Sequence, residues 1–501
     1  MLSPYHRYRL YEILPGLSVW VTLIGALVLS VVKPLWMIYF VIVFDVYWVL
    51  KALNYSFYLT LSWLRFRQVK SVNWKKRLRE ETKGTELYHI IFITLYNEPW
   101  EVAEPSISAM ADAVYDKEKF VVVIAGEGRQ KENFDNVYFR AQKKFGDKFY
   151  AILGTLHPAN PETEVAGKAS NLHYAEKQVN AFIEEKGWDK KQVVATIFDT
   201  DAICHEQYFA YLAYVYARTE NPTLSSYQPV PFYNNNLWES TAVLRVMAFG
   251  TSFWKMVSLA RQDSLHTFSS YSLSWQALFD IGFHDKTVIG EDARLFYQCQ
   301  LRYDGNYRVT PLYLPVYMDT VHDEKWWKSL KNLYTQQRRW AYGVEQIPYL
   351  LWNFYKKNTR MSFYKKMKWL FVEWESKWSW CCAVLLITIL GRLPLWLAPE
   401  SLRETTLYFN APHILQILMN FAVSALFVSV TLSLLLLPQK PKNYPTYSYV
   451  FIILQWILLP FSLICMGSFP AIDAITRLML GKYLGYTVAQ KNRAGVHTSI
   501  S

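Results

Sequence analysis

The chain has 501 residues, of which 52% are hydrophobic, 17% aromatic and only 19% charged, and its formal net charge is +12. This length is enough for one large domain with additional parts, and the charged fraction is low for a soluble protein. Lys and Arg gather beside apolar segments, which favours a membrane surface and argues against nucleic acid as a partner. The five cysteines lack metal-ligand spacing, so we expect no disulfide framework, as is typical of a reducing compartment.

Two apolar stretches, residues 14–32 and 35–50, follow a short basic N-terminus. Because a helix needs about 20 residues to cross a bilayer, we predict a transmembrane hairpin within residues 1–66. A signal peptide is a weaker interpretation, because the second stretch follows at once and no cleavage site stands out. Asp45 lies in the second stretch. An acid within a membrane segment either marks a polar pathway or faces a partner helix, and both interpretations stay open for Asp45.

The segment after the hairpin is rich in Arg and Lys, which predicts that residues 67–350 form a cytoplasmic domain. Strand-like apolar runs alternate there with amphipathic helical patterns, which predicts an α/β fold with a mostly parallel sheet. The expected strands cover residues 88–96, 119–126, 149–156, 193–198 and 224–232, and the expected helices cover residues 99–114, 133–145, 167–186 and 205–219.

Residues 351–377 mix cations with aromatic side chains at helical spacing, which predicts interfacial helices. Transmembrane helices are expected in residues 378–480, where the apolar stretches are 378–398, 413–437 and 447–469. Three crossings would place the tail, residues 481–501, outside, whereas its basic residues favour the cytoplasm. We follow the charges and expect a hidden or re-entrant segment near Pro460, leaving three or four C-terminal helices. The prediction is a multi-pass protein of the plasma or inner membrane with its catalytic domain in the cytoplasm.

The strand-like run VVATIFDTDA, residues 193–202, ends in Asp199 and Asp201. In an extended chain these side chains face the same way, so both can reach one divalent cation through hard oxygen ligands. Ligands of α/β proteins bind beyond the carboxyl ends of the strands. The alternative is an ordinary turn after a strand, where Asp is common.

Three further patterns place polar residues at strand ends or helix starts. Asn97 and Glu98 follow the first cytoplasmic strand, although such residues also begin helices. Lys168 begins a helix. A lysine beside the positive end of a helix can bind a diphosphate, although a solvated lysine at this position is equally common. Glu291 and Asp292 begin another helix. They either cap this helix, or one of them is a general base that takes a proton from an attacking hydroxyl.

The last pattern is YTQQRRWAYGVEQ, where Gln336, Arg339 and Trp340 share one face of a helix through their spacing. Arg can bind a diphosphate bidentately, and Trp offers a flat apolar platform to a sugar ring. A surface Arg beside a core Trp is the ordinary alternative.

Taken in order, these motifs resemble the membrane-integrated family 2 glycosyltransferases, which include the cellulose, hyaluronan and chitin synthases. The resemblance covers residues 88–348 and rests on GKASNL, DTDA, FGTSF (249–253), GED and QQRRW between membrane flanks. It implies a GT-A fold, a nucleotide-sugar donor, most often a UDP-sugar, and Mg²⁺ or Mn²⁺.

Carried over to this chain, the resemblance assigns roles to the residues. Asp199 would contact the nucleotide-sugar and, with Asp201, the metal. Asp292 would be the base. Lys168 and Arg339 would bind the donor diphosphate, and the acceptor would be bound by Glu291, Gln336 and Trp340.

One departure concerns the second strand, which ends IAGEGR where the family has an acidic pair of the form DDGS. Glu127 is the candidate replacement, and together with Asn97 and Glu98 it is expected at the nucleotide-sugar site.

Three functions are compatible with this reading. The first is a processive polysaccharide synthase that also exports its product, and the second is a transferase that adds one sugar to a lipid-linked acceptor. The third is a non-catalytic membrane subunit that keeps the fold. The acceptor is therefore a polysaccharide or a lipid, the bilayer is an expected partner, and the oligomeric state is not predicted.

Overall fold

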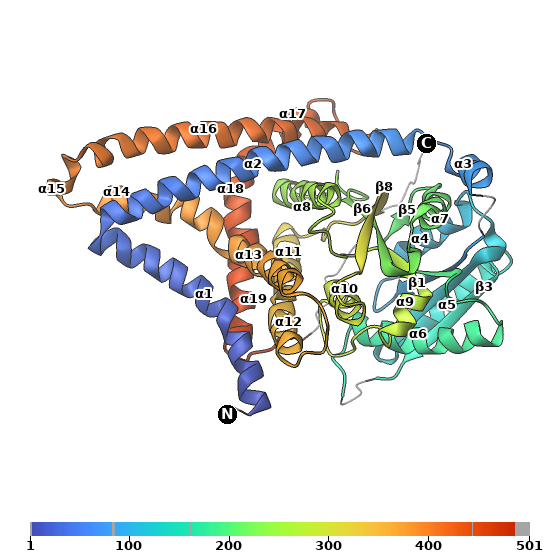
Figure 1. The fold of residues 1–501 in the computed structure, drawn as a ribbon. Helices are drawn as coiled ribbons and strands as arrows, with labels where there is room; N and C mark the ends of the chain where they lie inside the picture. The colour runs from blue at the N-terminus through green and yellow to red at the C-terminus, as the bar shows by residue number, and fades with distance from the viewer. Residues whose placement is uncertain (1–2, 83–85, 160–162, 443, 486–501) are drawn as a thin grey trace.

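The computed structural model describes residues 3–82, 86–159, 163–442 and 444–485. They form two parts, an α/β part with one mixed sheet and a bundle of long helices that projects from one side of it (Figure 1). The candidate site lies in the α/β part.

The sheet has eight strands in the order β3-β2-β1-β4-β7-β6-β8-β5. Its first half is parallel, as expected, and consists of β3 (Ala151–His157), β2 (Phe120–Glu127), β1 (Tyr88–Thr94) and β4 (Val193–Asp199). These apolar, β-branched runs are buried on both faces, as parallel strands between helix layers are.

The second half of the sheet contains antiparallel strands, so the sheet is mixed, although most of its strand pairings are parallel, as expected. β7 (Tyr271–Ser274) pairs antiparallel with both β4 and β6 (Ser225–Tyr233), whereas β8 (Arg308–Met318) runs parallel to β6 and antiparallel to β5 (Ile203–Cys204). β7 has the sequence YSLS, which is too short and polar to be recognised as a strand, yet it is fully buried.

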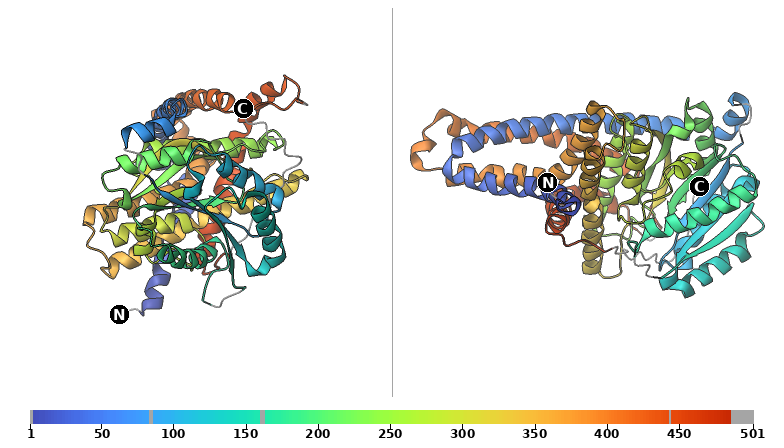
Figure 2. Two further views of the ribbon diagram at one scale, coloured as in Figure 1. Left: turned by 90° about the vertical axis from the view of Figure 1, so that its right-hand side faces the viewer. Right: turned by 60° about the horizontal axis from the view of Figure 1, so that its bottom comes forward.

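The helices of the α/β part cover both faces of the sheet (Figure 2) and lie close to the expected positions. They are α3 (Trp74–Glu81), α4 (Trp100–Asp112), α5 (Lys131–Phe145), α6 (Lys168–Glu185), α7 (Tyr208–Arg218), α9 (Trp275–Asp280) and α10 (Glu291–Arg302), with short 3-10 turns η1 (Lys117–Lys119), η2 (Gly128–Gln130) and η3 (Pro222–Leu224). Between the sheet and the projecting bundle lie α8 (Ala242–Ala260), α11 (Trp326–Ala341), η4 (Tyr342–Glu345) and α12 (Gln346–Tyr355) (Figure 1).

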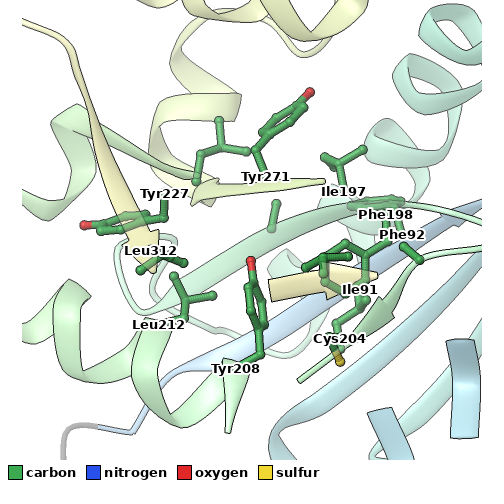
Figure 3. Packing of buried hydrophobic residues seen from close by; sticks show 14 of the residues in the cluster. Ile91, Phe92, Ile197, Phe198, Cys204, Tyr208, Leu212, Tyr227, Tyr271 and Leu312 are labelled. Atoms are coloured by element: carbon green, nitrogen blue, oxygen red, sulfur yellow. The ribbon is translucent and has the colours of Figure 1, made fainter. Parts of the chain in front are cut away.

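The core between the sheet and its helices is built from fully buried aliphatic and aromatic side chains (Figure 3). Burying one such side chain contributes roughly 1.5–3 kcal/mol. Three hydroxyls inside this core are paired with one another: the Ser272 hydroxyl lies 2.8 Å from that of Thr196 and 3.0 Å from that of Tyr208. These contacts fix β7 against β4, so the loop after residue 260 returns to the end of β4.

The projecting bundle contains the predicted N-terminal hairpin, α1 (Pro4–Val32) and α2 (Pro34–Lys70). α2 continues well beyond the apolar run, because the basic residues after it suit the negative end of a helix. Asp45 is buried within α2, and its Oδ1 has no hydrogen-bond partner among the described residues.

The rest of the projecting bundle comes from α13 (Phe363–Thr388), η5 (Leu390–Arg392), α14 (Leu393–Leu397), α15 (Glu400–Arg403) and α16 (Thr406–Leu435). α13 joins the expected interfacial segment and the first apolar stretch in one helix, so these are not separate elements. In the described part of the chain, four helices have the length and apolar character to span a membrane, and α13 with α14, bent by 40°, gives a fifth.

The last of these helices, residues 448–479, runs across the base of the bundle (Figures 1 and 2). Its pieces are α17 (Ser448–Leu454), η6 (Gln455–Leu458), α18 (Leu459–Ser462), the π-helical turn η7 (Leu463–Ser468) and α19 (Phe469–Met479). At its end, the Arg9 guanidinium donates hydrogen bonds to the carbonyls of Leu478 (3.2 Å) and Met479 (3.0 Å). The start of α1 and the end of α19 therefore lie together, and the rest of the predicted tail, residues 486–501, lies outside the described residues.

Candidate functional site

The site is built around Asp199, the last residue of β4. Its Oδ1 lies 2.5 Å from Lys168 Nζ, and its Oδ2 accepts a hydrogen bond of 2.7 Å from the Ser269 hydroxyl. The same Lys168 Nζ lies 3.0 Å from Glu291 Oε1. Lys168 and Glu291 are the first residues of α6 and α10, so one buried ammonium joins three motifs that are far apart in the sequence.

Asp201 lies in the turn after β4 and is buried. Its Oδ2 accepts a hydrogen bond of 2.7 Å from the backbone N–H of Asp319, the residue after β8. The amide of Asn235, just after β6, donates to Asp319 Oδ1 (2.8 Å) and to the Asp201 carbonyl (3.3 Å). Asp319 and Asn235 were not predicted from the sequence, although both lie within two residues of a strand end, the kind of position that singled out Asp199.

The carboxylates of Asp199 and Asp201 provide the hard oxygen donors that Mg²⁺ and Mn²⁺ prefer. Among the described residues, no group of three His, Cys, Asp or Glu side chains could hold a metal ion by itself. A magnesium-type ion commonly uses one or two protein carboxylates and completes its shell with water and substrate phosphates. The residues therefore fit a cation that is bound together with a diphosphate.

Asp292 is the second residue of α10 and is half-buried. Burial and, to a lesser extent, the negative charge of Glu291 raise the pKa of its carboxyl to about 6, against the opposing effects of Lys255 and Lys168. The Thr267 hydroxyl donates a hydrogen bond of 2.7 Å to the Asp292 carbonyl, which ties the start of α10 to the loop before β7. A carboxyl whose pKa lies near 6 is ionised at neutral pH and basic enough to accept a proton.

The loop before Asp292 is held by Glu345, at the end of η4. Its Oε1 accepts the backbone N–H groups of Ile289 (3.2 Å) and Gly290 (3.0 Å). Burial raises the pKa of Glu345, although these two hydrogen bonds and the positive charge of Arg294 lower it. The segment that follows the QQRRW motif thus positions the GED motif, a role that sequence analysis did not assign.

Trp340 and Gln336 line one pocket, as their helical spacing predicts. Tyr233, the last residue of β6, lines the same pocket, and its ring centroid lies 5.8 Å from that of Trp340. α8 forms another wall through Ala248 and Thr251.

Tyr233 shows how the predicted residues converge. The pKa of its hydroxyl is raised mainly by burial, then by the negative charges of Asp199, Asp201 and Asp292, and is lowered by Arg339. All four charges therefore act on one phenol. Tyr233 was missed in the sequence because a tyrosine at the end of a buried strand is usually part of the core.

The residues expected at the nucleotide occupy the neighbouring strand ends. Asn97 is exposed, and Glu98 Oε2 accepts the backbone N–H of Tyr96 at 2.8 Å. Glu127 ends β2 and is ion-paired with Arg129, whose guanidinium lies 5.1 Å from the centroid of the Tyr96 ring. All three residues share the sheet edge with Asp199. Asn97 and Glu98 follow β1, the direct neighbour of β4, whereas Glu127 is separated from Asp199 by β1.

No protein-family model and no curated protein sequence matches this chain. Among solved structures it is similar to the mannosyltransferase PcManGT from Pyrobaculum calidifontis in complex with GDP-Man and Mn²⁺, with 14% identity over 88% of this chain and 100% of that one, and a TM-score of 0.43. It is also similar to residues 1–349 of TarS from S. aureus, with 10% identity over 79% and 93% of the two chains and a TM-score of 0.34. For GalNAc-T7 with UDP, GalNAc and Mn²⁺ the identity is 10%, the coverage 56% of each chain and the TM-score 0.32. Since these scores are low, the function proposed below rests on the residues of this chain.

Proposed function

We propose that this protein is a membrane-bound, inverting glycosyltransferase that transfers a sugar from a nucleotide-sugar to an acceptor hydroxyl. The observation that carries the proposal is the contact of Lys168 with both Asp199 and Glu291. It brings a cation, a strand-end carboxylate and the start of the helix that bears Asp292 into one site. The Lys168 ammonium provides the positive charge that a diphosphate needs, and Asp292 provides the base that an attacking hydroxyl needs.

In the proposed reaction, the Asp292 carboxylate takes the proton of the acceptor hydroxyl. The hydroxyl oxygen bonds to the anomeric carbon from the face opposite the leaving group, while the bond between that carbon and the phosphate oxygen breaks. The nucleoside diphosphate leaves with the electron pair, and the configuration at the anomeric carbon is inverted.

On the leaving-group side, Lys168 and Arg339 would bind the diphosphate. Asp199 and Asp201 would hold Mg²⁺ or Mn²⁺, which when bound offsets charge on the diphosphate as a Lewis acid. Asp199 Oδ1 cannot bind the metal ion and Lys168 equally well. When the ion is bound, Lys168 would therefore exchange its contact with Asp199 for one with the substrate diphosphate.

The acceptor is proposed to lie in the pocket of Tyr233, Gln336 and Trp340. An indole face gives a sugar ring apolar contact, and the amide can hydrogen-bond its hydroxyls. A platform of this kind suits a growing polysaccharide, and we favour a processive synthase that also exports its product. The second candidate is single addition to a lipid-linked acceptor, which is supported by the small number of helices long enough to span a membrane.

The test is turnover by the full chain in lipid nanodiscs supplied with UDP- and GDP-sugars and Mg²⁺ or Mn²⁺. We expect at least one donor to release nucleoside diphosphate, and Asp292→Asn to slow this release by about 10²–10⁴-fold. The matched control is Asp263→Asn, because Asp263 is exposed and belongs to the loop after α8. Equal release by the wild type and by Asp292→Asn with every donor would contradict the proposal.

The products separate the two candidates. Chains of many sugars that stay associated with one enzyme during dilution would support processivity. A single sugar on a product that partitions into organic solvent would support the lipid acceptor. Retention of the donor's anomeric configuration would contradict an inverting reaction.

A further inference from the structure

Two lysines and a histidine beside Asp292 are used neither by the donor site nor by the proposed base. Lys255 comes from α8, His266 from the loop before β7 and Lys377 from α13. The Lys255 ammonium lies 3.8 Å from the centroid of the Phe268 ring. Lys377 Nζ is so close to η4 that a methyl group on Gly343 would lie 3.2 Å from it.

The α8 helix connects this group with the acceptor pocket. Ala248 and Thr251 line the pocket, and Lys255 follows Thr251 by four residues, on the same helix face. Gly343 follows Trp340 by three residues. Lys255 therefore lies one helical turn along α8 from the pocket wall, and Lys377 lies beside the turn that follows the QQRRW motif.

Neither ammonium group is satisfied by the protein. Among the described residues, Lys255 and Lys377 form no hydrogen bond and no ion pair within 4.0 Å, and Lys255 contacts only an aromatic face. Desolvation and, to a lesser extent, repulsion from Lys377 lower the pKa of Lys255 to about 8, against the attraction of Asp292 and Glu373. Two partly buried cations without acceptors carry a desolvation cost that an anionic ligand would offset.

The nearby acids do not fill this role. Glu373 is buried, and its Oε1 already accepts the Tyr297 hydroxyl at 2.7 Å and lies 3.8 Å from His266 Nε2. Asp292 attracts Lys255, but as the proposed base it loses its charge when it takes the acceptor proton. His266 keeps 31% of its side chain accessible, so the group can be reached by a ligand.

We propose that Lys255 and Lys377 form a binding site for an oxyanion, either a carboxylate or a phosphate, that the acceptor carries next to its attacking oxygen. The acceptor role of this site rests on the proposed function, whereas anion binding itself can be measured without turnover. An ammonium binds either oxyanion through charge-assisted hydrogen bonds.

Binding is measured by thermophoresis on the full chain in nanodiscs, with Asp292→Asn as the background so that no transfer occurs. Two pairs of probes differ in charge: farnesyl phosphate against farnesol, and a glucuronate-terminated disaccharide against a glucose-terminated one. We expect at least one anionic probe to bind more than tenfold more tightly than its neutral partner, with a ratio that falls as NaCl is raised. A ratio near one for both pairs would overturn the proposal.

Lys255→Met and Lys377→Met should each reduce this ratio by about tenfold, the usual effect of losing a hydrogen bond to a charged group. The matched control is Lys366→Met, because Lys366 lies on α13 with Lys377 but its ammonium faces the Phe354 ring at 5.6 Å. Ratios that survive both lysine substitutions would also overturn the proposal. Lys255→Arg keeps the charge and should keep the preference, so it covers the case in which Lys255→Met fails to fold.

The two anionic probes identify the source of the charge. A preference for the glucuronate would mean an acidic sugar acceptor, and transfer to it should require Asp292. A preference for farnesyl phosphate would mean that the acceptor carries a lipid phosphate. A charge preference in binding without transfer to any probe by the wild type would contradict the proposed function and leave the anion site standing.

Discussion

Lys168 forms an ion pair with Asp199 in which Nζ and Oδ1 are 2.5 Å apart, and both side chains lie at the carboxyl edge of the sheet. The same ammonium is shared with Glu291 at 3.0 Å, and Lys168 is only 8% exposed. Removing one partner of a buried ion pair leaves an uncompensated charge, which typically costs about 3–5 kcal/mol.

Lys168→Met is therefore expected to lower the midpoint of thermal unfolding and to raise the KM for the nucleotide-sugar by about tenfold or more. The double variant Lys168→Met/Glu291→Gln should regain stability, because one unpaired acid is removed, without regaining donor affinity. Differential scanning fluorimetry and donor titration measure the two effects. Normal donor affinity in the double variant would contradict a role of Lys168 in donor binding.

The pH dependence of turnover should follow Asp292. Its pKa is raised to about 6, mainly by burial, and a general base must be ionised to act. The value of kcat/KM is expected to rise from pH 5 to pH 7 with an inflection near 6 and to stay level above it. A profile already flat at pH 5 would argue that Asp292 is not the base.

The same shift predicts the effect of Asp292 on stability. Because its folded pKa lies above that of an unfolded aspartate, the folded state binds the extra proton, and stability falls as pH rises from about 4 to 6. Asp292→Asn removes this cost, so it should raise the unfolding midpoint at pH 7, and the gain should shrink toward pH 5. An equal gain at both pH values would point to a cause other than ionisation.

Glu345 is expected to act as a positioning residue for Asp292. One oxygen of Glu345 accepts both N–H groups of the loop, and Gln can supply the same oxygen. Glu345→Ala should lower kcat by about 10–100-fold with little change in donor KM, since small misplacements of a catalytic group are costly. Glu345→Gln should keep most of the activity. Equal losses in both variants would show that the carboxylate charge matters, and not the hydrogen bonds.

Removing divalent cations with EDTA should abolish donor turnover, and Mg²⁺ or Mn²⁺ should restore it. The unfolding midpoint should change little when the ion is removed without donor, because Lys168 and the Asp319 N–H already satisfy oxygens of the two aspartates. Full activity in EDTA would contradict metal dependence. A large stabilisation by the ion alone would contradict a site that is completed by the diphosphate.

The sequence predicted the strands that carry Asp199 and Glu127 because continuous β-branched runs have few other uses in a domain of this size. It could not predict that β7 separates β4 from β6, since YSLS has neither the length nor the hydrophobicity of a recognisable strand. This insertion places the loop of Ser269 and Thr267 against Asp199 and Asp292. Their role follows from tertiary pairing and leaves no local pattern.

For the site, motif spacing was enough to group Gln336 with Trp340, because helical periodicity fixes which side chains share a face. Partners such as Tyr233, Glu345 and Lys255 come from elements that are distant along the chain, and each has an ordinary core or surface explanation when viewed alone. Glu127 was predicted to take over a nucleotide contact, and its ion pair with Arg129 means that any such role would use a carboxylate already neutralised by a neighbour.

The contact of Arg9 with the last carbonyls of α19 has a consequence for biosynthesis. α19 also supports α11, because the Arg338 guanidinium donates a hydrogen bond of 3.0 Å to Asp473 Oδ2. α19 therefore supports the helix that carries Trp340 and also contacts the start of α1. A nascent chain in which α19 has not yet been made would contain all of the proposed chemical groups but lack this support, so we expect the pocket of Trp340 to form only after α19 has been synthesised.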